Sequence, residues 1–411
     1  MISVSEALAR VLDGLPGTGH EQVALTRARG RVLAEKITAL HDVPPFRNSA
    51  MDGVALRSAD VAGAAAATPV RLRVLETVGA GRVASQPVVP GSAIRIMTGA
   101  PMPDGADAVV KVEDTAEAGA DVAIHAAVGS GTNVRHAGED LRAGATVLAA
   151  GRLLRPADIG LIASLGLPML RVAQRPRVAI LATGDELVDV GAPLGPGQIV
   201  NSNAYALAAA VEEAGAEPRL MGIVRDTPDC IRAAFAEAID ADLVLSTGGV
   251  SVGSFDYVRP MLAELGYQER FWKVAQKPGK PLTFGTCGRT PVFGLPGNPV
   301  SSLVCFYLYV LPALRTMMGL ERVHLPSAAA TLAGTLKTSI GMTEFVRCVL
   351  EGSADDLRAR STGTQSSGAL HSLSVGDALI VAPPDVATLA AGARVRVVLL
   401  AADAAAAAPP F

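Results

Sequence analysis

The chain has 411 residues, of which 50% are hydrophobic and only 4% aromatic, with a formal net charge of −3 at pH 7. This length predicts two to four domains. The small negative charge gives no basic footprint for nucleic acid. The longest strongly apolar run, Leu303–Leu314, is too short for a membrane span and contains Pro312, and no basic and apolar leader opens the chain. We therefore expect a cytoplasmic protein that binds neither nucleic acid nor membranes.

The cysteines and histidines give no sign of a metal or disulfide framework. The four cysteines lie far apart without a C-x-x-C pair, and the six histidines show no H-x-x-x-H spacing. Zinc sites and disulfide scaffolds usually show such patterns. We expect buried free thiols in a reducing compartment.

The N-terminal part combines two patterns. Val4–Leu12 and Val23–Leu33 have a helical period, and a helical period returns at Ala157–Leu165. Between them, residues 41–138 form short apolar runs split by Pro and Gly, which is typical of β structure. This order predicts a helical N-terminal domain, 1–40 and 139–175, with a β domain inserted at 41–138.

Residues 176–326 alternate between strand and helix patterns, which predicts a doubly wound α/β domain. The connections between strands near 270–275, 282–286 and 291–295 are too short for helices, so part of the sheet should be antiparallel. The expected strands and helices are, in chain order, Arg177–Leu181, Asn201–Gly215, Arg219–Val224, 226–239, Asp242–Ser246, 256–265 and Pro299–Met318.

The last part of the chain returns to β patterns. Residues 327–400 show short strands with Gly turns, and Arg394–Leu399 alternates as a strand does. This pattern predicts a small β barrel or sandwich, of which we expect a C-terminal small β barrel. Residues 401–411 are of low complexity and are expected to be a disordered tail.

Two short loops are the strongest sign of a binding site. Three of the six lysines, Lys273, Lys277 and Lys280, fall within eight residues, and Lys277-Pro-Gly-Lys-Pro281 resembles a polyproline turn that places two ammoniums on one side. In Gly294-Leu-Pro-Gly-Asn-Pro-Val300, Asn298 and Pro299 fit the start of a helix, where free N–H groups favour a phosphate. Each loop alone is also explained as a structural turn. Together they predict an anion site.

Further loops follow predicted strands directly. In open α/β sheets, ligands lie outside the carboxyl ends of the strands, and Thr183–Glu186 and Ser246–Gly253 both occupy such positions. Gly248 and Gly249 would let the backbone approach a ligand, or simply make a tight turn. Asp185 and Glu186 would suit a divalent cation bridging phosphates, or cap the next segment. The same alternatives hold for Asp226 and Asp256, which are also placed as helix N-caps.

Three N-terminal segments place an ionisable or hydroxyl residue beside a glycine in a loop, although each is also explained as a turn. They are Asn48-Ser-Ala-Met-Asp-Gly53, Arg95-Ile-Met-Thr-Gly-Ala-Pro101 and Arg135-His-Ala-Gly-Glu-Asp140.

With these segments, Thr183-Gly-Asp-Glu-Leu187, Gly248-Gly-Val-Ser-Val-Gly253 and both loops above, the chain resembles the molybdopterin molybdenumtransferases, which include bacterial MoeA and the E-domain of gephyrin. The resemblance runs from about residue 4 to 400 with the motifs in order. It implies a homodimer that inserts molybdenum from molybdate into adenylylated molybdopterin and releases AMP in a Mg²⁺-dependent step.

The resemblance also implies residue roles. Arg347 and Ser367 match loosely, because Thr364-Gln-Ser-Ser367 departs from a commoner version with Gly and His. The expected catalytic residues are Asp52, Asp140, Glu186, Lys277 and Lys280, and the expected metal ligands are Asp185, Glu186 and Asp256. The expected cofactor-binding residues are Thr98, Arg135, Asp226, Gly248, Gly249, Ser251, Gly253, Pro296, Gly297, Asn298, Arg347 and Ser367.

Two other functions share part of this pattern. Molybdopterin adenylyltransferases and a family related to competence proteins use the same α/β domain but typically lack the N-terminal motifs. A scaffold or receptor-binding role, as in gephyrin, would be additional to catalysis. A separate adenylyltransferase is a possible docking partner.

Overall fold

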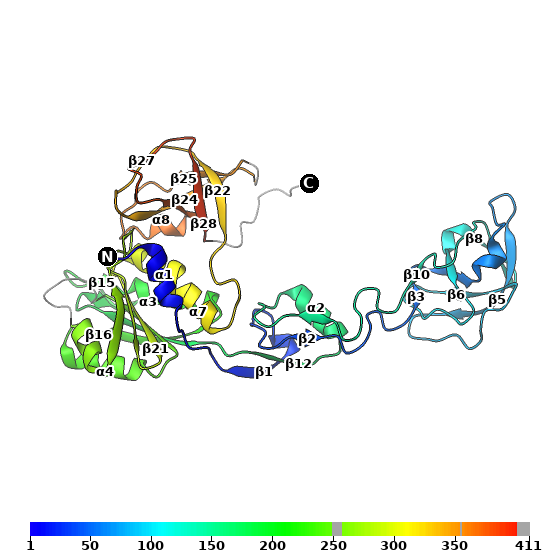
Figure 1. Ribbon diagram of the computed structural model, residues 1–411, viewed down its shortest axis with the longest axis horizontal. Coiled ribbons are helices and arrows are strands. Elements are labelled where there is room, and N and C mark those ends of the chain that lie inside the picture. The colour runs from blue at the N-terminus through cyan, green and yellow to red at the C-terminus, as the bar shows by residue number, and fades with distance from the viewer. Residues whose placement is uncertain (249–256, 354–355, 401–411) are drawn as a thin grey trace.

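The computed structural model describes residues 1–248, 257–353 and 356–400. The molecule is elongated (Figure 1). An α/β sheet and a β barrel lie at one end, and a separate β sheet lies at the other. A slender connector, residues 20–38 and 146–173, joins the two ends. The disordered tail expected at 401–411 lies outside the described residues.

The α/β sheet has the strand order β16-β13-β17-β21-β20-β18. The first four strands are parallel, and β20 is antiparallel to both of its neighbours. The antiparallel part predicted from the short connections is therefore present. The strands are β13 (Arg177–Thr183), β16 (Glu217–Val224), β17 (Leu243–Thr247), β18 (Tyr267–Trp272), β20 (Thr283–Cys287) and β21 (Thr290–Leu295).

Helices cover both faces of this sheet because successive strand residues point to opposite sides. Ile180 of β13 packs with one set of helices, and its neighbours Ala179 and Leu181 pack with the other. The first set contains α1 (Val4–Leu12), α3 (Ser202–Glu213) and the α6–α7 helix, and the second contains α4 (Pro228–Ala238) and α5 (Val258–Glu264).

The helix after β21 is longer than its apolar run suggests. It comprises α6 (Pro299–Cys305), a π-helical segment (Phe306–Val310) and α7 (Leu311–Met317). Its 19 residues are long and apolar enough to cross a membrane by length and composition, so the length argument from the sequence was wrong. However, 72% of its apolar window is buried within the fold, against α1 and α3. Its apolar character is explained by this core position.

The C-terminal strands close into a five-stranded barrel in the order β24-β25-β22-β28-β26, with β26 pairing back to β24. Ala330, Val346, Cys348 and Ile380 are part of its core. The elements are β22 (Ser327–Leu332), β24 (Thr343–Glu351), β25 (Arg358–Ser361), α8 (His371–Ser374), β26 (Ala378–Ala382) and β28 (Arg394–Leu399).

The connector is built mainly of strand pairs. β1 (His20–Ala24) pairs with β12 (Met169–Ala173), and β2 (Ile37–Thr38) pairs with β11 (Thr146–Leu148). Its one α-helix within the described residues is α2 (Pro156–Ser164).

The helix predicted over Val23–Leu33 is wrong, whereas the helices predicted over Val4–Leu12 and Ala157–Leu165 are present as α1 and α2. Val23 and Ala24 form ladder pairs with β12, a single 3₁₀ turn follows at Leu25–Arg27, and Gly30 adopts a φ of +74°. Pairing with a strand almost 150 residues away overrides the local period.

The sheet at the far end has the order β7-β4-β6-β5-β9-β8. Its strands are β4 (Gly53–Leu56), β5 (Val70–Val78), β6 (Ser92–Ile96), β7 (Ala108–Lys111), β8 (Thr115–Ala118) and β9 (Asp121–Ile124). The short pair β3 (Asn48–Ser49) and β10 (Val134–Arg135) lies where this sheet meets the connector (Figure 1).

The four cysteines are unpaired in the structure. Cys287, Cys305 and Cys348 are buried, as expected. Cys230 is exposed, contrary to the expectation, because it lies on the solvent side of α4.

Candidate functional site

Three parallel strands bring the predicted loops to one edge of the α/β sheet. β13 pairs with β17, and β17 pairs with β21, all in parallel. Their carboxyl ends, Thr183, Thr247 and Leu295, therefore lie next to one another. The loops that follow them form one surface, as the strand order of an open α/β sheet requires.

A pocket of about 350 Å³ opens between these loops. We call it the strand-end pocket. It brings together Glu186, Gly248, Gly297 and Asn298 from three separate predicted motifs. Its lining residues are Thr183, Glu186, Leu187, Ile199, Val200, Asn201, Ser202, Asn203, Thr247, Gly248, Gly297, Asn298, Pro299 and Gly368.

Gly248 is required by the close packing of two of these loops. Its φ is +94°, and a Cβ there would lie 2.4 Å from the Thr183 carbonyl oxygen. Any side chain would therefore push the two loops apart. Gly249, Ser251 and Gly253, which complete the predicted motif, lie outside the described residues.

The start of α3, which the sequence predicted only as part of a helix, supplies pocket residues. Asn201 does cap the helix, since its side chain accepts a hydrogen bond from the Ala204 N–H. Asn203, in contrast, donates from Nδ2 to Thr247 Oγ1 at 2.8 Å and to the Gly297 carbonyl at 2.7 Å. It thereby ties the loop after β17 to the loop after β21. A second asparagine two residues after the cap was the only signal for this role.

Two hydroxyl groups near the same edge are buried without a partner. Thr183 Oγ1 and Ser246 Oγ are buried and make no hydrogen bond within the described residues. Buried polar atoms in native proteins are nearly always paired with protein or water. A bound ligand or water at the strand-end pocket would satisfy Thr183, which lines it.

Asp185, Glu186 and Asp226 lie close enough to influence one another. The Asp226 N–H donates to Asp185 Oδ1 at 3.3 Å. Burial raises the pKa of Asp226, and repulsion by Asp185 and Glu186 raises it further. Glu186 is positioned by its own backbone, because its carbonyl accepts from the Ile199 N–H at 2.9 Å. The site thus concentrates negative charge beside the pocket.

The carboxylates of Asp185, Glu186 and Asp226 suit a hard cation, but they do not form a complete set of metal ligands. Carboxylate oxygens are the ligands that Mg²⁺ prefers. Within residues 1–248, 257–353 and 356–400, no three acidic, histidine or cysteine side chains stand at metal-ligand geometry. Asp256, the third predicted metal ligand, lies outside these ranges.

The lysine loop is not polyproline-like. Gly279 has a φ of +96°, and its packing against Gln276 and Cys305 leaves no room for a Cβ. The regular turn that was expected to place the two ammoniums on one side is therefore absent. Lys277 Nζ instead lies 3.3 Å from Glu344 Oε1, and Glu344 is only 5% exposed.

Lys280 differs from Lys277 in having no such partner. It is exposed, and no hydrogen bond or ion pair of its ammonium occurs within the described part of the chain. Of the two lysines, Lys280 is therefore the one whose charge is available to a ligand.

The loop at residues 364–368 of the barrel region reaches the strand-end pocket. Ser367 Oγ accepts from Asn298 Nδ2 at 2.9 Å, and its carbonyl accepts from the Val300 N–H at 3.1 Å. Arg347 lies behind this loop, only 1% exposed, and donates to the carbonyls of Thr364, Gln365 and Ser366. Arg347 thus holds the loop, whereas Ser367 lies at the pocket. Pro296 is likewise buried, and its carbonyl accepts from Thr247 Oγ1.

Two of the four predicted N-terminal residues, Asp52 and Thr98, form a cluster separate from the strand-end pocket. Asp52 Oδ1 accepts from the Thr98 N–H at 2.6 Å and from its hydroxyl at 2.8 Å. These two bonds lower the pKa of Asp52. The other two, Arg135 and Asp140, are exposed. No hydrogen bond or ion pair joins them to Asp52 or Thr98 in the described residues.

The structure does not bring this cluster to the strand-end pocket of the same chain. Asp52 immediately precedes β4 of the distal sheet, whereas the pocket lies at the edge of the α/β sheet, at the opposite end of the molecule (Figure 1).

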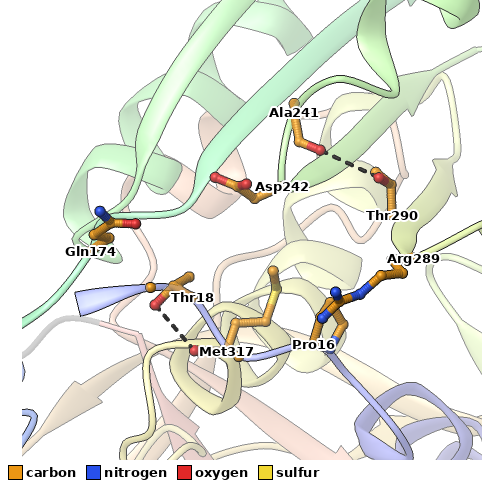
Figure 2. Close-up of a pocket in the computed structure, with 10 residues that line it drawn as sticks. Pro16, Thr18, Gln174, Ala241, Asp242, Arg289, Thr290 and Met317 are labelled. Atoms are coloured by element: carbon orange, nitrogen blue, oxygen red, sulfur yellow. Dashed lines mark hydrogen bonds between the residues drawn. The ribbon is translucent and has the colours of Figure 1, made fainter.

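A smaller cavity of about 190 Å³ lies at the amino ends of the same parallel strands (Figure 2). The linkers at residues 16–19 and 174 pass over it on their way to the connector. Thr18 donates to the Met317 carbonyl, and Thr290 donates to that of Ala241. This cavity contains none of the predicted site residues.

Family models match the chain in three consecutive parts. They are described as MoeA N-terminal region (domain I and II) at residues 2–166, probable molybdopterin binding domain at 179–316, and MoeA C-terminal region (domain IV) at 329–400. The strand-end pocket lies almost entirely within the second part. Molybdopterin molybdenumtransferase 2 of Mycobacterium tuberculosis is 41% identical over 97% of this chain and 99% of its own length. The chain belongs to the molybdopterin molybdenumtransferase family.

Other family members agree along the whole chain. The Bacillus subtilis molybdopterin molybdenumtransferase is 38% identical, covering 97% of this chain and 94% of its own. The crystal structure of a molybdopterin biosynthesis MoeA protein from Pyrococcus horikoshii OT3 superposes with a TM-score of 0.85 at 33% identity, covering 97% of this chain and 100% of that one.

Proposed function

We propose that this protein acts in molybdenum cofactor biosynthesis, inserting molybdenum from molybdate into adenylylated molybdopterin with release of AMP. The observation that carries the proposal is the strand-end pocket, which joins Glu186, Gly248, Gly297 and Asn298 in the part of the chain that matches a molybdopterin-binding domain. The relatives named molybdopterin molybdenumtransferase, alike along nearly the full chain, support it.

The pocket has the groups that an adenylylated pterin needs. Gly248 and Gly297 leave the backbone accessible to phosphate and sugar oxygens. The start of the helix at Pro299 provides positive charge at the pocket, and we assign the exposed ammonium of Lys280, which is not a lining residue, to the same phosphates. Thr183 lines the pocket and offers a hydroxyl that has no hydrogen-bond partner in the described residues. Molybdate, a small dianion, needs the same kinds of donor.

We assign the acidic residues to a Mg²⁺ ion. Asp185 and Glu186, with Asp256, would hold the ion, which when bound would supply positive charge for the phosphate oxygens. The same ion would stabilise the ionised form of Asp226, because it would reduce the repulsion from Asp185 and Glu186. Glu186 would orient the water that attacks the phosphoanhydride; one water is consumed and AMP leaves.

We further propose that the protein works as a homodimer. Asp52 and Thr98 match positions that family members use, yet they lie far from the strand-end pocket of their own chain. A second subunit related by a two-fold axis could bring its Asp52 to this pocket. Such an elongated dimer would also leave surface for an adenylyltransferase that delivers the adenylylated substrate.

The test is AMP release from adenylylated molybdopterin, measured with and without molybdate. The proposal predicts AMP release that requires Mg²⁺ and is stimulated by molybdate. If the protein instead formed adenylylated molybdopterin from ATP, it would be an adenylyltransferase. The match of residues 2–166 to the MoeA N-terminal region argues against that alternative.

A further inference from the structure

Four arginines surround a cavity outside the strand-end pocket. The cavity has a volume of about 470 Å³ and lies between the connector and the end of the core helix. We call it the arginine cavity. Its lining residues are Ala149, Ala150, Gly151, Arg152, Leu153, Arg155, Arg315, Leu320, Glu321 and Arg322.

The two walls of the cavity are held firmly together. Gly151 has a φ of +79°, and a Cβ there would lie 2.6 Å from the Gly319 carbonyl oxygen. Beside this contact, Val32 and Ala173 of the connector pack against Met318 in a small apolar cluster. The two segments that carry the guanidinium groups therefore pack directly against each other.

The positive charge in the cavity is only partly neutralised. Asp158, 3% exposed, accepts two bonds from Arg152 and lies 3.6 Å from Arg155 Nε. Glu321 is the one carboxylate on the wall. Glu213 also attracts Arg315, so four guanidiniums face three carboxylates and one positive charge remains.

The free donors on these arginines point to an anion with several oxygens. Arg315 uses only Nη1, on the carbonyls of Val323 and His324, and burial lowers the pKa of its guanidinium. Arg322 is exposed and makes no hydrogen bond or ion pair in the described residues. Guanidinium forks match phosphate oxygens in pairs, and a cavity of this size admits a small ligand.

We propose that the arginine cavity binds a di- or triphosphate group, as inorganic pyrophosphate or as the phosphate chain of a nucleotide. The anion contacts Arg155 on the connector and Arg322 on the segment after α7, and it braces one against the other. This site is distinct from the strand-end pocket, since the two share no lining residue.

Calorimetric titration of the full chain with inorganic pyrophosphate tests the proposal. The Lys280→Ala protein serves as the background, so that any binding of pyrophosphate through Lys280 is removed. We expect saturable binding of one pyrophosphate, weakened about tenfold or more by Arg155→Ala and by Arg322→Ala. Arg71→Ala, which removes an exposed arginine of the distal sheet, is the matched control and should bind normally.

Three results would overturn the proposal. They are the absence of saturable binding at millimolar pyrophosphate, an affinity in Arg155→Ala and Arg322→Ala that is unchanged from the background protein, or an equal loss in Arg71→Ala, which would indicate general charge attraction. A parallel titration with ATP identifies the source: tighter binding of ATP indicates a nucleotide, and equal binding indicates the phosphate chain alone. Circular dichroism of each variant confirms that it is folded.

Discussion

Neighbouring residues with the same chemistry have different roles at this site. Lys277 neutralises the buried Glu344, whereas Lys280, three residues later, is exposed. Asn201 caps α3, whereas Asn203 joins two loops of the pocket. These differences depend on which residue each side chain meets across the fold. The sequence motifs therefore identified the loops but not the role of each residue within them.

Lys280→Ala should weaken the binding of adenylylated molybdopterin and leave thermal stability nearly unchanged. Charge-assisted bonds to phosphate contribute roughly 1.5–3 kcal/mol each, or about 10- to 150-fold in affinity. Titration calorimetry measures this loss. Lys337→Ala removes an exposed lysine of the barrel region and is the matched control. Unchanged affinity in Lys280→Ala would remove this loop from the site.

Glu186→Gln should still bind substrate but lose molybdate-dependent AMP release. The amide keeps the shape of the side chain and removes the charge that Mg²⁺ or the attacking water requires. A Mg²⁺ titration of the rate is the measurement, with Glu212→Gln on α3 as the control. Turnover at the normal rate with the same Mg²⁺ dependence would show that Glu186 has another role.

Asp226→Asn should stabilise the protein at neutral pH when no divalent cation is present. Burial and two neighbouring carboxylates raise the pKa of Asp226 in the folded state. Below the ordinary carboxyl pKa, Asp226 is protonated in both the folded and the unfolded state and does not change the free energy of unfolding. As pH rises from the ordinary pKa through the raised pKa of the folded state, ionisation favours the unfolded state and the free energy of unfolding falls. We expect a higher Tm for the variant at pH 7, with the difference shrinking toward about pH 4. A lower Tm at pH 7 would contradict this account.

At the scale of elements, the sequence predicted the α/β part best. Its central strands β13 and β17 are buried apolar runs, and its helices begin at favoured residues, such as the N-cap Asn201 of α3 and Pro228 at the first position of α4, so local and tertiary preferences agree. The connector could not be predicted, because Val23 and Ala24 become a strand only through pairing with Leu170 and Met169. The loop at 364–368 was likewise assigned to the site only by resemblance, since its contact with Asn298 spans 69 residues.

Arg347→Lys should destabilise the barrel loop that reaches the pocket. A lysine cannot reproduce the guanidinium fork that serves the carbonyls of Thr364, Gln365 and Ser366, so buried acceptors lose their partners. We expect a loss on the order of 2–4 kcal/mol in the free energy of unfolding. Urea denaturation measures it, and Arg360→Lys at an exposed ion pair is the control. Equal stability of the two variants would contradict the assigned role.

At the scale of the whole molecule, the distance between the two sets of family residues is the main finding. The strand-end pocket lies at one end, and Asp52 with Thr98 lies toward the other (Figure 1). Sequence analysis gave both sets but could not place them, because a linear motif order carries no information on domain arrangement. The proposed two-fold dimer would bring Asp52 of one subunit to the strand-end pocket of the other.

Mixing Asp52→Ala with Lys280→Ala protein tests this arrangement most directly. Each variant alone should be nearly inactive in AMP release. After subunit exchange between equal amounts, half of the dimers are mixed, and each mixed dimer has one site with both lesions and one with none. Activity should therefore recover to about a quarter of the wild-type value. No recovery despite demonstrated exchange would mean that each site is built from a single chain, and it would contradict the shared site.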